Sequence, residues 1–338
     1  MAMTIYDISK KAGVSIATVS RVLNDSENVR PSTRKKVMDI IDKYDYTPNA
    51  FARGMGLHSL KTIGILCADS SDLFLAKAVY FLEQELQANG YESLLCCTGY
   101  NLNIKKNYLN LILSKKVDSI ILVGSHFIGS TEDENQYIKD VSTQVPIMLL
   151  NASFDHPNVY STLCDDYGTM FEAATEMIQA GITDILYLYD SKSYSGKKKL
   201  SGFRDAMKEH NIPGYEKLIH FYDGNIEHLD EVADFVAHIA KKGTCFHGIM
   251  TSDDSLAIGS IKYAQKKGIR IPEELSVMGY NNSMLTNCCT PELTSVDNRL
   301  ETLTHQLVQT LLGVLAGEEM PKKSIFSGKI IKRGTTLF

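Results

Sequence analysis

Apolar residues in the first part of the chain recur at helical spacing, and residues that start or stop helices interrupt the pattern. Gly13 breaks the first stripe, Ser15 suits the N-cap of a second helix, and Pro31 suits the first turn of a third. Three short helices around a small shared core predict a helix-turn-helix module. The apolar positions of the three stripes are Ile5, Ile8 and Ala12, then Val19, Val22 and Leu23, and then Val37, Ile40 and Ile41.

From Lys61 onward, short apolar runs such as "TIGILCA", "SIILVG" and "DILYLY" alternate with amphipathic helical patterns. Strands that are almost wholly apolar and alternate with helices indicate parallel sheets covered on both faces. The run "VYSTLCDD" follows "PIMLLN" without a helix between them, and this break near residue 155 favours two lobes over one large sheet or a barrel. Ligands of open α/β sheets bind at the carboxyl ends of strands, so the cleft between two lobes is the expected small-molecule site.

The segment between these two blocks predicts a helix that is too weak to stand alone. Pro48 suits a first turn, but Gly54 and Gly56 flank Met55 only two turns later. Each glycine costs a helix roughly 1 kcal/mol relative to alanine, and isolated helices of this length are marginal in water. We therefore expect a conditional helix that needs a partner.

Composition indicates a soluble globular protein of two or three domains: the chain has 338 residues, of which 44% are hydrophobic and 22% charged. No run of 18 apolar residues predicts a transmembrane helix, and the N-terminus lacks the pattern of a signal peptide. The seven cysteines are an odd number without C-x-x-C spacing, which favours reduced thiols. We expect a cytoplasmic protein that does not contact a membrane.

Charge is distributed unevenly between the two blocks. Residues 1–60 contain nine basic and six acidic residues, whereas the remainder contains 26 basic and 34 acidic ones. A small basic module joined to a larger acidic one suggests that the small module binds a polyanion.

Enzyme motifs are missing from the sequence. It has no G-x-G-x-x-G after a strand, no P-loop and no G-x-S-x-G, and its nine histidines lack metal-ligand spacing. Asp253 and Asp254 could serve acid–base chemistry, but Asp254 also stands where an acidic side chain would start the following helix. We expect no catalytic residues, no cofactor and no metal.

In a helix-turn-helix module, the N-terminal residues of the second helix enter the major groove of DNA. Arg21 could donate two hydrogen bonds to a guanine edge, and the hydroxyl side chains could bind phosphates or bases. A helical hairpin without DNA function would show the same spacing. The groove-facing candidates are Ser15, Ile16, Ala17, Thr18, Ser20, Arg21 and Asn24.

The stretch "TIYDISKKAGVSIATVSRVLN", continued by "VRPSTRKKVMDIIDKYDYTPNAFARGMG", resembles the DNA-binding head of the lactose-repressor (LacI/GalR) family of transcription regulators. The segments "GFRDAM" (202–207), "SDDSLAIGSIKYAQKKGIRIPEELSVMGYNN" (252–282) and "PELTSVDN" (291–298) are similar to landmarks of the family's core. The resemblance implies a periplasmic-binding-protein-type core of two lobes joined by three crossovers. It also implies a homodimer on a near-palindromic operator.

The resemblance gives the expected domains. An all-α helix-turn-helix head spans residues 1–46, a hinge helix and linker 47–60, and a two-lobed α/β core 61–338. Within that core we expect an N-lobe at about 61–160 and 292–322, and a C-lobe at about 161–291 and 323–338.

The resemblance also implies a set of contact residues. Met55 falls where the family has a leucine that wedges between base pairs, and an apolar wedge of this kind kinks DNA. To the groove-facing candidates the resemblance adds Thr4, Tyr6, Thr33, Tyr46, Asn49, Ala52, Arg53 and Met55 as DNA contacts. For the effector pocket it implies Phe74, Asn151, Ser195, Lys199, Asp253, Asn281 and Asn298.

Two exchanges in the implied pocket bear on the effector. Lys199 stands where many sugar-binding members have arginine, and Asn281 replaces an aspartate. Together with Lys197 and Lys198, Lys199 could favour an anionic ligand such as a phosphorylated or acidic sugar. Alternatively, Lys197 and Lys198 are a solvated helix start.

The expected function is a repressor of a carbohydrate uptake or catabolic operon, controlled by a sugar or sugar derivative. Ile16 and Ala17 are similar to the reading pair of catabolite control proteins, whose core answers to a protein partner. Glu301 and Gln309 stand where that group has a tyrosine and an arginine, which disfavours control by a phosphorylated protein. A solute-binding module without DNA function is disfavoured by the basic head and the missing signal peptide.

Overall fold

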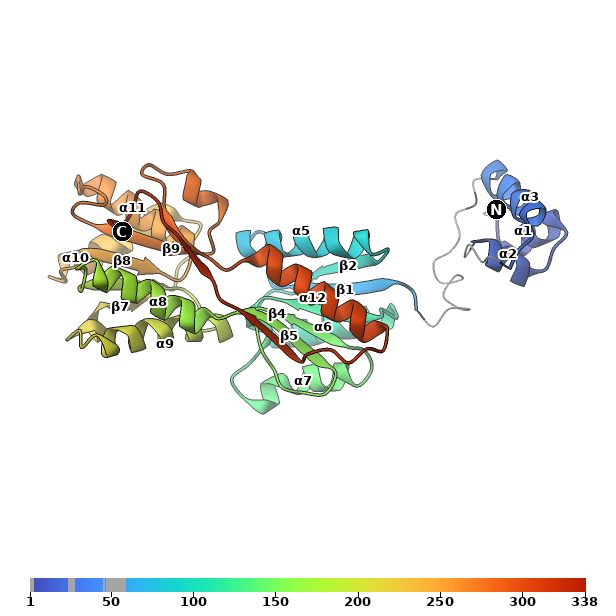
Figure 1. The fold of residues 1–338 in the computed structure, drawn as a ribbon, viewed down its shortest axis with the longest axis horizontal. Helices are drawn as coiled ribbons and strands as arrows, with labels where there is room; N and C mark the ends of the chain where they lie inside the picture. Colours follow the sequence, from blue (N-terminus) through green and yellow to red (C-terminus); the bar gives the residue numbers. More distant parts are fainter. Residues whose placement is uncertain (1–2, 24–27, 45, 47–58) are drawn as a thin grey trace.

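The computed structural model describes residues 3–23, 28–44, 46 and 59–338. Its N-terminal part is a three-helix head, which lies at one end of the molecule in Figure 1. The helices are α1 (Ile5–Ala12), α2 (Ile16–Leu23) and α3 (Pro31–Lys43). The buried core of the head consists of Ile8, Ala12, Val19, Val22, Val37 and Ile41, all of which belong to the predicted apolar stripes.

Local side chains begin and end the first two helices of the head. The Thr4 hydroxyl accepts a hydrogen bond from the Asp7 backbone amide, and the Asp7 carboxylate accepts one from the Thr4 amide. Gly13 ends α1 in the left-handed region at φ 62°. As predicted, Ser15 caps α2, because its Oγ accepts from the Thr18 amide at 3.1 Å.

The first core lobe, which we call the N-lobe, contains a six-stranded sheet in the order β11-β5-β4-β3-β1-β2, with every pairing parallel. Helices α5 (Leu73–Ala88) and α12 (Leu300–Leu315) cover one face. Helices α6 (Leu102–Ser114) and α7 (Glu132–Ser142) cover the other. The strands are β1 (Thr62–Cys67), β2 (Glu92–Cys97), β3 (Ser119–Val123), β4 (Ile147–Leu150), β5 (Val159–Cys164) and β11 (Lys323–Phe326), and the turn η1 (Ser125–Phe127) follows β3.

The second lobe, the C-lobe, repeats this architecture with the order β12-β10-β9-β8-β6-β7, in which only β12 is antiparallel. Helices α8 (Asp166–Gln179) and α9 (Tyr194–Glu209) cover one face, and α10 (Leu229–Lys241) and α11 (Asp254–Lys267) the other. The strands are β6 (Ile185–Tyr189), β7 (Ile219–Phe221), β8 (Gly248–Thr251), β9 (Ser276–Tyr280), β10 (Thr294–Asp297) and β12 (Lys329–Ile331), with turns η2 (Tyr215–Leu218) and η3 (Met284–Asn287).

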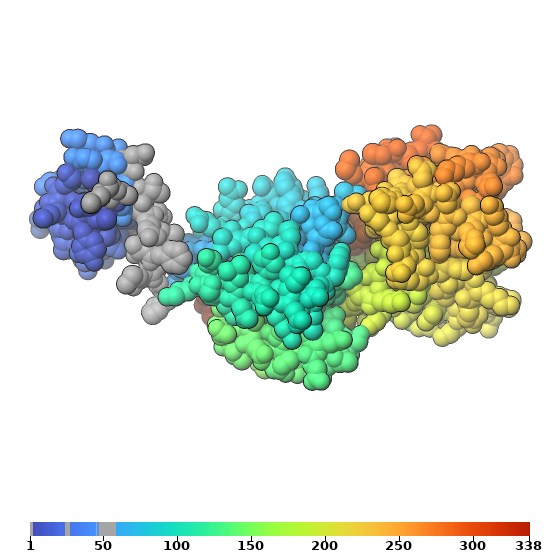
Figure 2. All heavy atoms as spheres, turned by 180° about the vertical axis from the view of Figure 1, so that it is seen from behind, coloured from blue at the N-terminus to red at the C-terminus, as the bar shows by residue number. Residues whose placement is uncertain are grey.

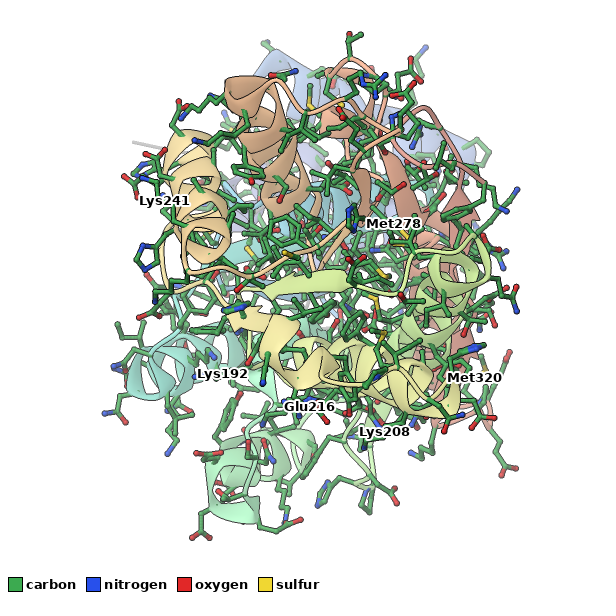
Figure 3. All side chains as sticks on the ribbon, turned by 90° about the vertical axis from the view of Figure 1, so that its left-hand side faces the viewer. Lys192, Lys208, Glu216, Lys241, Met278 and Met320 are labelled. Carbon is green, nitrogen blue, oxygen red and sulfur yellow. The ribbon has the colours of Figure 1, made fainter. Side chains whose placement is uncertain are left out.

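The interior of the C-lobe is apolar, as nearly unbroken apolar strands require. Met278 of β9 is fully buried and lies in the middle of the lobe in Figure 3, whereas Lys208 and Lys241 lie toward its outside. The predicted fold class, a helix-turn-helix head with a two-lobed α/β core, is therefore confirmed.

The chain crosses between the lobes three times, but later than the expected boundaries. It passes from β5 to α8, from β10 to α12, and from β11 to β12. Strand β10, expected in the N-lobe, belongs to the C-lobe sheet, and β11, expected in the C-lobe, belongs to the N-lobe sheet. The expected boundaries were wrong because a strand must complete its backbone hydrogen bonds before the chain can leave the sheet.

Close packing of α8 against α9 depends on Gly202. A Cβ atom at this position would meet the backbone carbonyl oxygen of Tyr167 and the backbone nitrogen of Phe171. Only a residue without a side chain lets these two helix backbones approach so closely.

We therefore predict that Gly202→Ala lowers the free energy of unfolding by about 1–3 kcal/mol, because overpacking outweighs alanine's better helix propensity. The neighbouring Ser201 is exposed, so Ser201→Ala is a matched control that should change stability little. Urea unfolding of both variants measures the difference. A Gly202→Ala protein as stable as the wild type would contradict the packing argument.

Candidate functional site

The N-terminal end of α2 forms an exposed surface on the head. Ile16 is 39% exposed, and Ala17 and Arg21 are also exposed. Ser15 and Thr18 share a hydrogen bond of 2.9 Å between their hydroxyl groups, and both face solvent at least in part. The surface thus presents hydroxyl, apolar and guanidinium groups together at the start of the second helix, and groups of these kinds can contact base edges.

The other DNA-contact candidates are spread over the head. Thr4 caps α1, and Tyr6 next to it is 68% exposed. Ser20 and Thr33 are half-buried, and Tyr46 packs against the head's core. The candidates Asn24, Asn49, Ala52, Arg53 and Met55 lie outside the described residues.

The core contains a cleft between the lobes, at the carboxyl ends of the strands of both sheets. Its outer part has a volume of about 680 Å³ and its inner part about 90 Å³. Figure 2 shows the furrow between the N-lobe and the C-lobe from the back of the molecule. Both parts share the lining residues Asp72, Phe74, His126, Asp190, Ser191, Ile226, Asp253 and Asn281.

The structure brings most of the effector candidates to this cleft. The inner part is lined by six of them, namely Phe74, Asn151, Ser195, Lys199, Asp253 and Asn281. Asn298 lies behind Asn281 and lines a separate outer groove instead. Lys197 and Lys198 are exposed and line none of the three hollows, so neither places its charge in the cleft.

A short hydrogen-bonded chain runs along one wall of the cleft. The Asn281 side-chain amide donates to the Asp253 carboxylate at 2.8 Å, and its oxygen accepts from the Asn298 amide at 3.1 Å. An aspartate at position 281 could not donate to Asp253 and would repel it. Asparagine at position 281 therefore suits the neighbouring Asp253 carboxylate, whereas an aspartate there would not.

The two adjacent aspartates at the start of α11 have different roles from those expected. Asp253, not Asp254, is the N-cap, and its carboxylate accepts from the Ser255 amide at 2.7 Å. Asp254 is buried and accepts from the Ser283 amide and the Ser295 hydroxyl, each at 2.6 Å. It thus ties the helix to strand β10 and to the loop before η3 rather than starting the helix.

Lys199 is 7% exposed, and the protein itself engages its charge. Its ammonium group donates to the Ser252 carbonyl at 3.0 Å and lies 3.8 Å from the centre of the Tyr280 ring. Burial raises the pKa of the nearby Asp166 carboxyl, and the positive charge of Lys199 offsets part of that rise. Tyr280 donates a further hydrogen bond to Asp166 at 2.7 Å.

The open part of the cleft is lined by carboxylates. Burial raises the pKa of Asp72, and Asp190 and Asp69 raise it further. Burial also raises the pKa of Asp253 to about 7, with additional repulsion from Asp254 and Asp190. Three carboxylates from two lobes therefore repel one another across the cleft.

Sequence reasoning missed Asp72, His126 and Asp190. Each follows closely after the carboxyl end of an apolar run, at β1, β3 and β6 respectively. The rule that ligands bind at the carboxyl ends of parallel strands would have found all three if applied to every strand. Burial and nearby Lys105 lower the pKa of His126, so its ring is neutral near pH 7.

Asn151 carries a polar atom with no partner in the cleft. The side chain is 8% exposed, and its Oδ1 accepts no hydrogen bond from the described residues. Its backbone is in the left-handed region at φ 62°, and Asn281 at the end of β9 has φ 99°. Unsatisfied polar atoms and positive φ values of this kind collect at ligand sites.

Two family models match this sequence. Bacterial regulatory proteins of the lacI family match at residues 4–49, and a periplasmic binding protein-like domain matches at residues 174–336. A relative in Lachnoclostridium phytofermentans, an HTH-type transcriptional regulator, is 50% identical over 336 residues, which is 99% of this chain and 100% of the relative. The chain belongs to the lacI family. It is a DNA-binding transcription regulator, and its relatives are regulators rather than enzymes.

Further likenesses agree with this assignment. Catabolite control protein A of Priestia megaterium is 32% identical over 303 residues, which cover 88% of this chain and 87% of that protein. A lac repressor dimer bound to operator and an anti-inducer matches with a TM-score of 0.88 at 21% identity, over all of both chains. The second likeness shows the shared fold of head and core.

The described part of the chain contains neither a membrane-spanning helix nor a metal cluster. None of its helices is long and apolar enough to cross a membrane. Residues 3–23, 28–44, 46 and 59–338 also contain no group of three or more histidine, cysteine or acidic side chains that could hold a metal ion.

The raised pKa of Asp253 predicts a pH-dependent stability of the ligand-free core. The pKa of Asp253 is about 7 in the folded protein, compared with an ordinary value of 3.8 for an aspartate. At a pH between these two values, folding is therefore accompanied by the uptake of a proton. This contribution is present at low pH and is lost as the pH rises through about 7. Lowering the pH from about 8 to about 5.5 should therefore stabilise the fold by about 2 kcal/mol through this group.

Urea midpoints at both pH values measure the effect, and Asp253→Asn should remove it while keeping a helix cap. Asp155→Asn, at an exposed loop position, is the charge-matched control. An unchanged pH dependence in the Asp253→Asn protein would show that this carboxyl is not the group responsible.

Proposed function

We propose that this regulator is a repressor of an operon for carbohydrate uptake or catabolism, acting in the bacterial cytoplasm, and that a small polyhydroxylated molecule in the cleft controls it. The observation that carries the proposal is that one chain contains both a cleft whose walls belong to different lobes and the exposed helix α2 of the head. A ligand that contacts both walls changes how the lobes are oriented. A regulator needs such a link between ligand and conformation.

A homodimer fits the surface of the N-lobe. Strand β2 is the edge of its sheet, yet Leu94 and Leu95 on it are 38% and 45% exposed. Tyr80 of α5 and Leu111 of α6 are also exposed. Residues 90–115 form much of the N-lobe surface seen in Figure 2. An apolar edge strand is normally covered, and a second copy of the chain would cover it while placing two heads on two operator half-sites.

The cleft favours a neutral or positively charged effector over the anionic one that Lys199 suggested. The Lys199 ammonium is held by the Ser252 carbonyl and the Tyr280 ring, whereas Asp72, Asp190 and Asp253 line the cavity. A phosphate or carboxylate entering there would meet like charges. Hydroxyl groups can donate to these carboxylates, as sugar hydroxyls do.

Contacts between the lobes indicate how closure could be controlled. The Ser125 hydroxyl of the N-lobe donates to that of Ser193 in the C-lobe at 2.8 Å, and Lys197 donates to Ser130 at 2.6 Å. A ligand that also joins Asp72 to Asp190 would set the angle between the lobes, and through the N-lobes the spacing of the two heads.

Gel-shift titration with the DNA upstream of the gene's own operon tests the DNA-binding part of the proposal. Arg21→Gln should lower affinity for that DNA by about tenfold to a hundredfold, because a side chain that reads a guanine edge contributes about 1–3 kcal/mol of discrimination. Lys43→Gln, at the end of α3, removes the same charge and should have a small effect. Equal losses in both variants would show that Arg21 contributes only charge.

Release of that DNA by added sugars tests the effector part. Catabolite control protein A, a relative, makes control by a partner protein the second candidate, but Glu301 and Gln309 are both exposed on α12 and neither can bind a phosphate as arginine does. If operator release requires a cell extract's protein fraction and no small molecule replaces it, the partner model holds instead.

A further inference from the structure

The cleft carries a surplus of negative charge that a neutral sugar leaves uncompensated. Asp72 enters from the N-lobe, and Asp190 and Asp253 enter from the C-lobe. Among the described residues that line the two parts of the cleft, Lys199 is the only lysine or arginine. Its ammonium is already engaged, and the His126 ring has a lowered pKa and is neutral near pH 7.

These carboxylates are coupled to one another across the cleft. Asp190 raises the pKa of Asp72 on the opposite lobe and that of Asp253 on its own lobe, in addition to the larger effect of burial. Asp190 accepts one hydrogen bond, from the Ser252 hydroxyl at 2.7 Å. A positive charge between the three would replace mutual repulsion by attraction.

A second observation, independent of the acidic residues, is an unpartnered hydrogen-bond acceptor on a residue that lines the cleft. The Asn151 Oδ1 is an unpartnered acceptor on a side chain that is 8% exposed, and Asn151 lines the inner part of the cleft with Asp72, Asp190 and Asp253. Leaving a buried acceptor unpaired is unfavourable, because the group has lost its hydrogen bonds to water. The carboxylates and the unpaired Asn151 oxygen are all hydrogen-bond acceptors, so this wall favours a ligand that is rich in N–H and O–H groups.

The size and spread of these groups favour an organic cation over a metal ion. No group of three or more acidic, histidine or cysteine side chains in the described part of the chain is arranged to hold a metal. The inner part, of about 90 Å³, adjoins an outer part of about 680 Å³. An ammonium or hydroxyl group fits the first, and one or two sugar rings fit the second.

We propose that the effector is a polyhydroxylated amine, such as an amino sugar, whose ammonium group binds between Asp72 of the N-lobe and Asp190 and Asp253 of the C-lobe. This inference rests on the proposed function, in which a small molecule in the cleft controls the regulator. Because the carboxylates lie on both lobes, the ammonium draws the lobes together. When it leaves, their repulsion favours the open cleft.

Calorimetric titration of the full-length protein with matched probes tests the charge of the ligand. The probes are 2-amino-2-deoxy and 6-amino-6-deoxy forms of glucose and galactose, the two parent sugars, and their 6-phosphates. At least one amine should bind at least about tenfold more tightly than its parent sugar, and the phosphates should bind more weakly still. The proposal is overturned if a parent sugar or phosphate binds as tightly as its amine, or if none of the amines binds at about 10 mM.

Two variants at opposite ends of β6 distinguish the effect of a carboxylate in the cleft from the effect of the protein's net charge. Asp190→Asn should reduce the preference for the amine over its parent sugar by about tenfold, since a carboxylate contact is lost. Asp184→Asn removes an equal charge at the amino end of the same strand, where Asp184 pairs with His247, and should keep the preference. An unchanged preference in Asp190→Asn would contradict the assigned position of the ammonium.

Gel shifts with the same preparations distinguish the two proposals. If the protein binds its upstream DNA and a parent sugar releases it as well as the amine does, the proposed function stands and the amine inference fails. If the protein does not bind this DNA at all, the proposed function fails, whatever the calorimetry shows.

Discussion

Parallel strand pairing is the constraint on which the cleft depends. Among the described strands, every pairing except that of β12 with β10 is parallel, so the carboxyl ends in each lobe gather at one edge. The three crossovers turn these two edges toward each other. Residues far apart in the sequence, from Asp72 to Asn281, therefore meet in one cavity, and a ligand there necessarily contacts both lobes.

Burial decides which charges of this cavity are available to a ligand. Lys199 looks like an anion-binding group until its neighbours are known: the Ser252 carbonyl, the Tyr280 ring and the nearby Asp166 engage it within the C-lobe. Among the described residues, no lysine or arginine other than Lys199 lines the cleft beside the carboxylates of Asp72, Asp190 and Asp253. In the sequence, Lys199 suggests an anionic ligand, whereas in the structure the carboxylates favour a neutral or positively charged one. The preference changes because interaction energies in a buried site depend on solvation and on neighbouring groups.

The cleft and the N-lobe are physically continuous along one wall. The hydrogen bonds from Asp253 through Asn281 to Asn298 run from the start of α11 to the second crossover, and α12 of the N-lobe begins two residues later. A change at Asp253 thus reaches the beginning of an N-lobe helix through direct contacts. A ligand that contacts Asp253 could therefore change the position of α12 relative to the C-lobe through this chain of hydrogen bonds.

The sequence by itself determined the fold class, the head's core and caps, and the family, because helical and strand periodicities and cap residues act over a few neighbouring positions. It also placed Phe74, Asn151 and Lys199 among the candidates for one pocket, through the resemblance. Only the tertiary structure decided where the chain crosses between the sheets, that Asp253 rather than Asp254 caps α11, and that Asp72 faces Asp190. Those features depend on contacts between distant segments, whose burial and charge no local pattern contains.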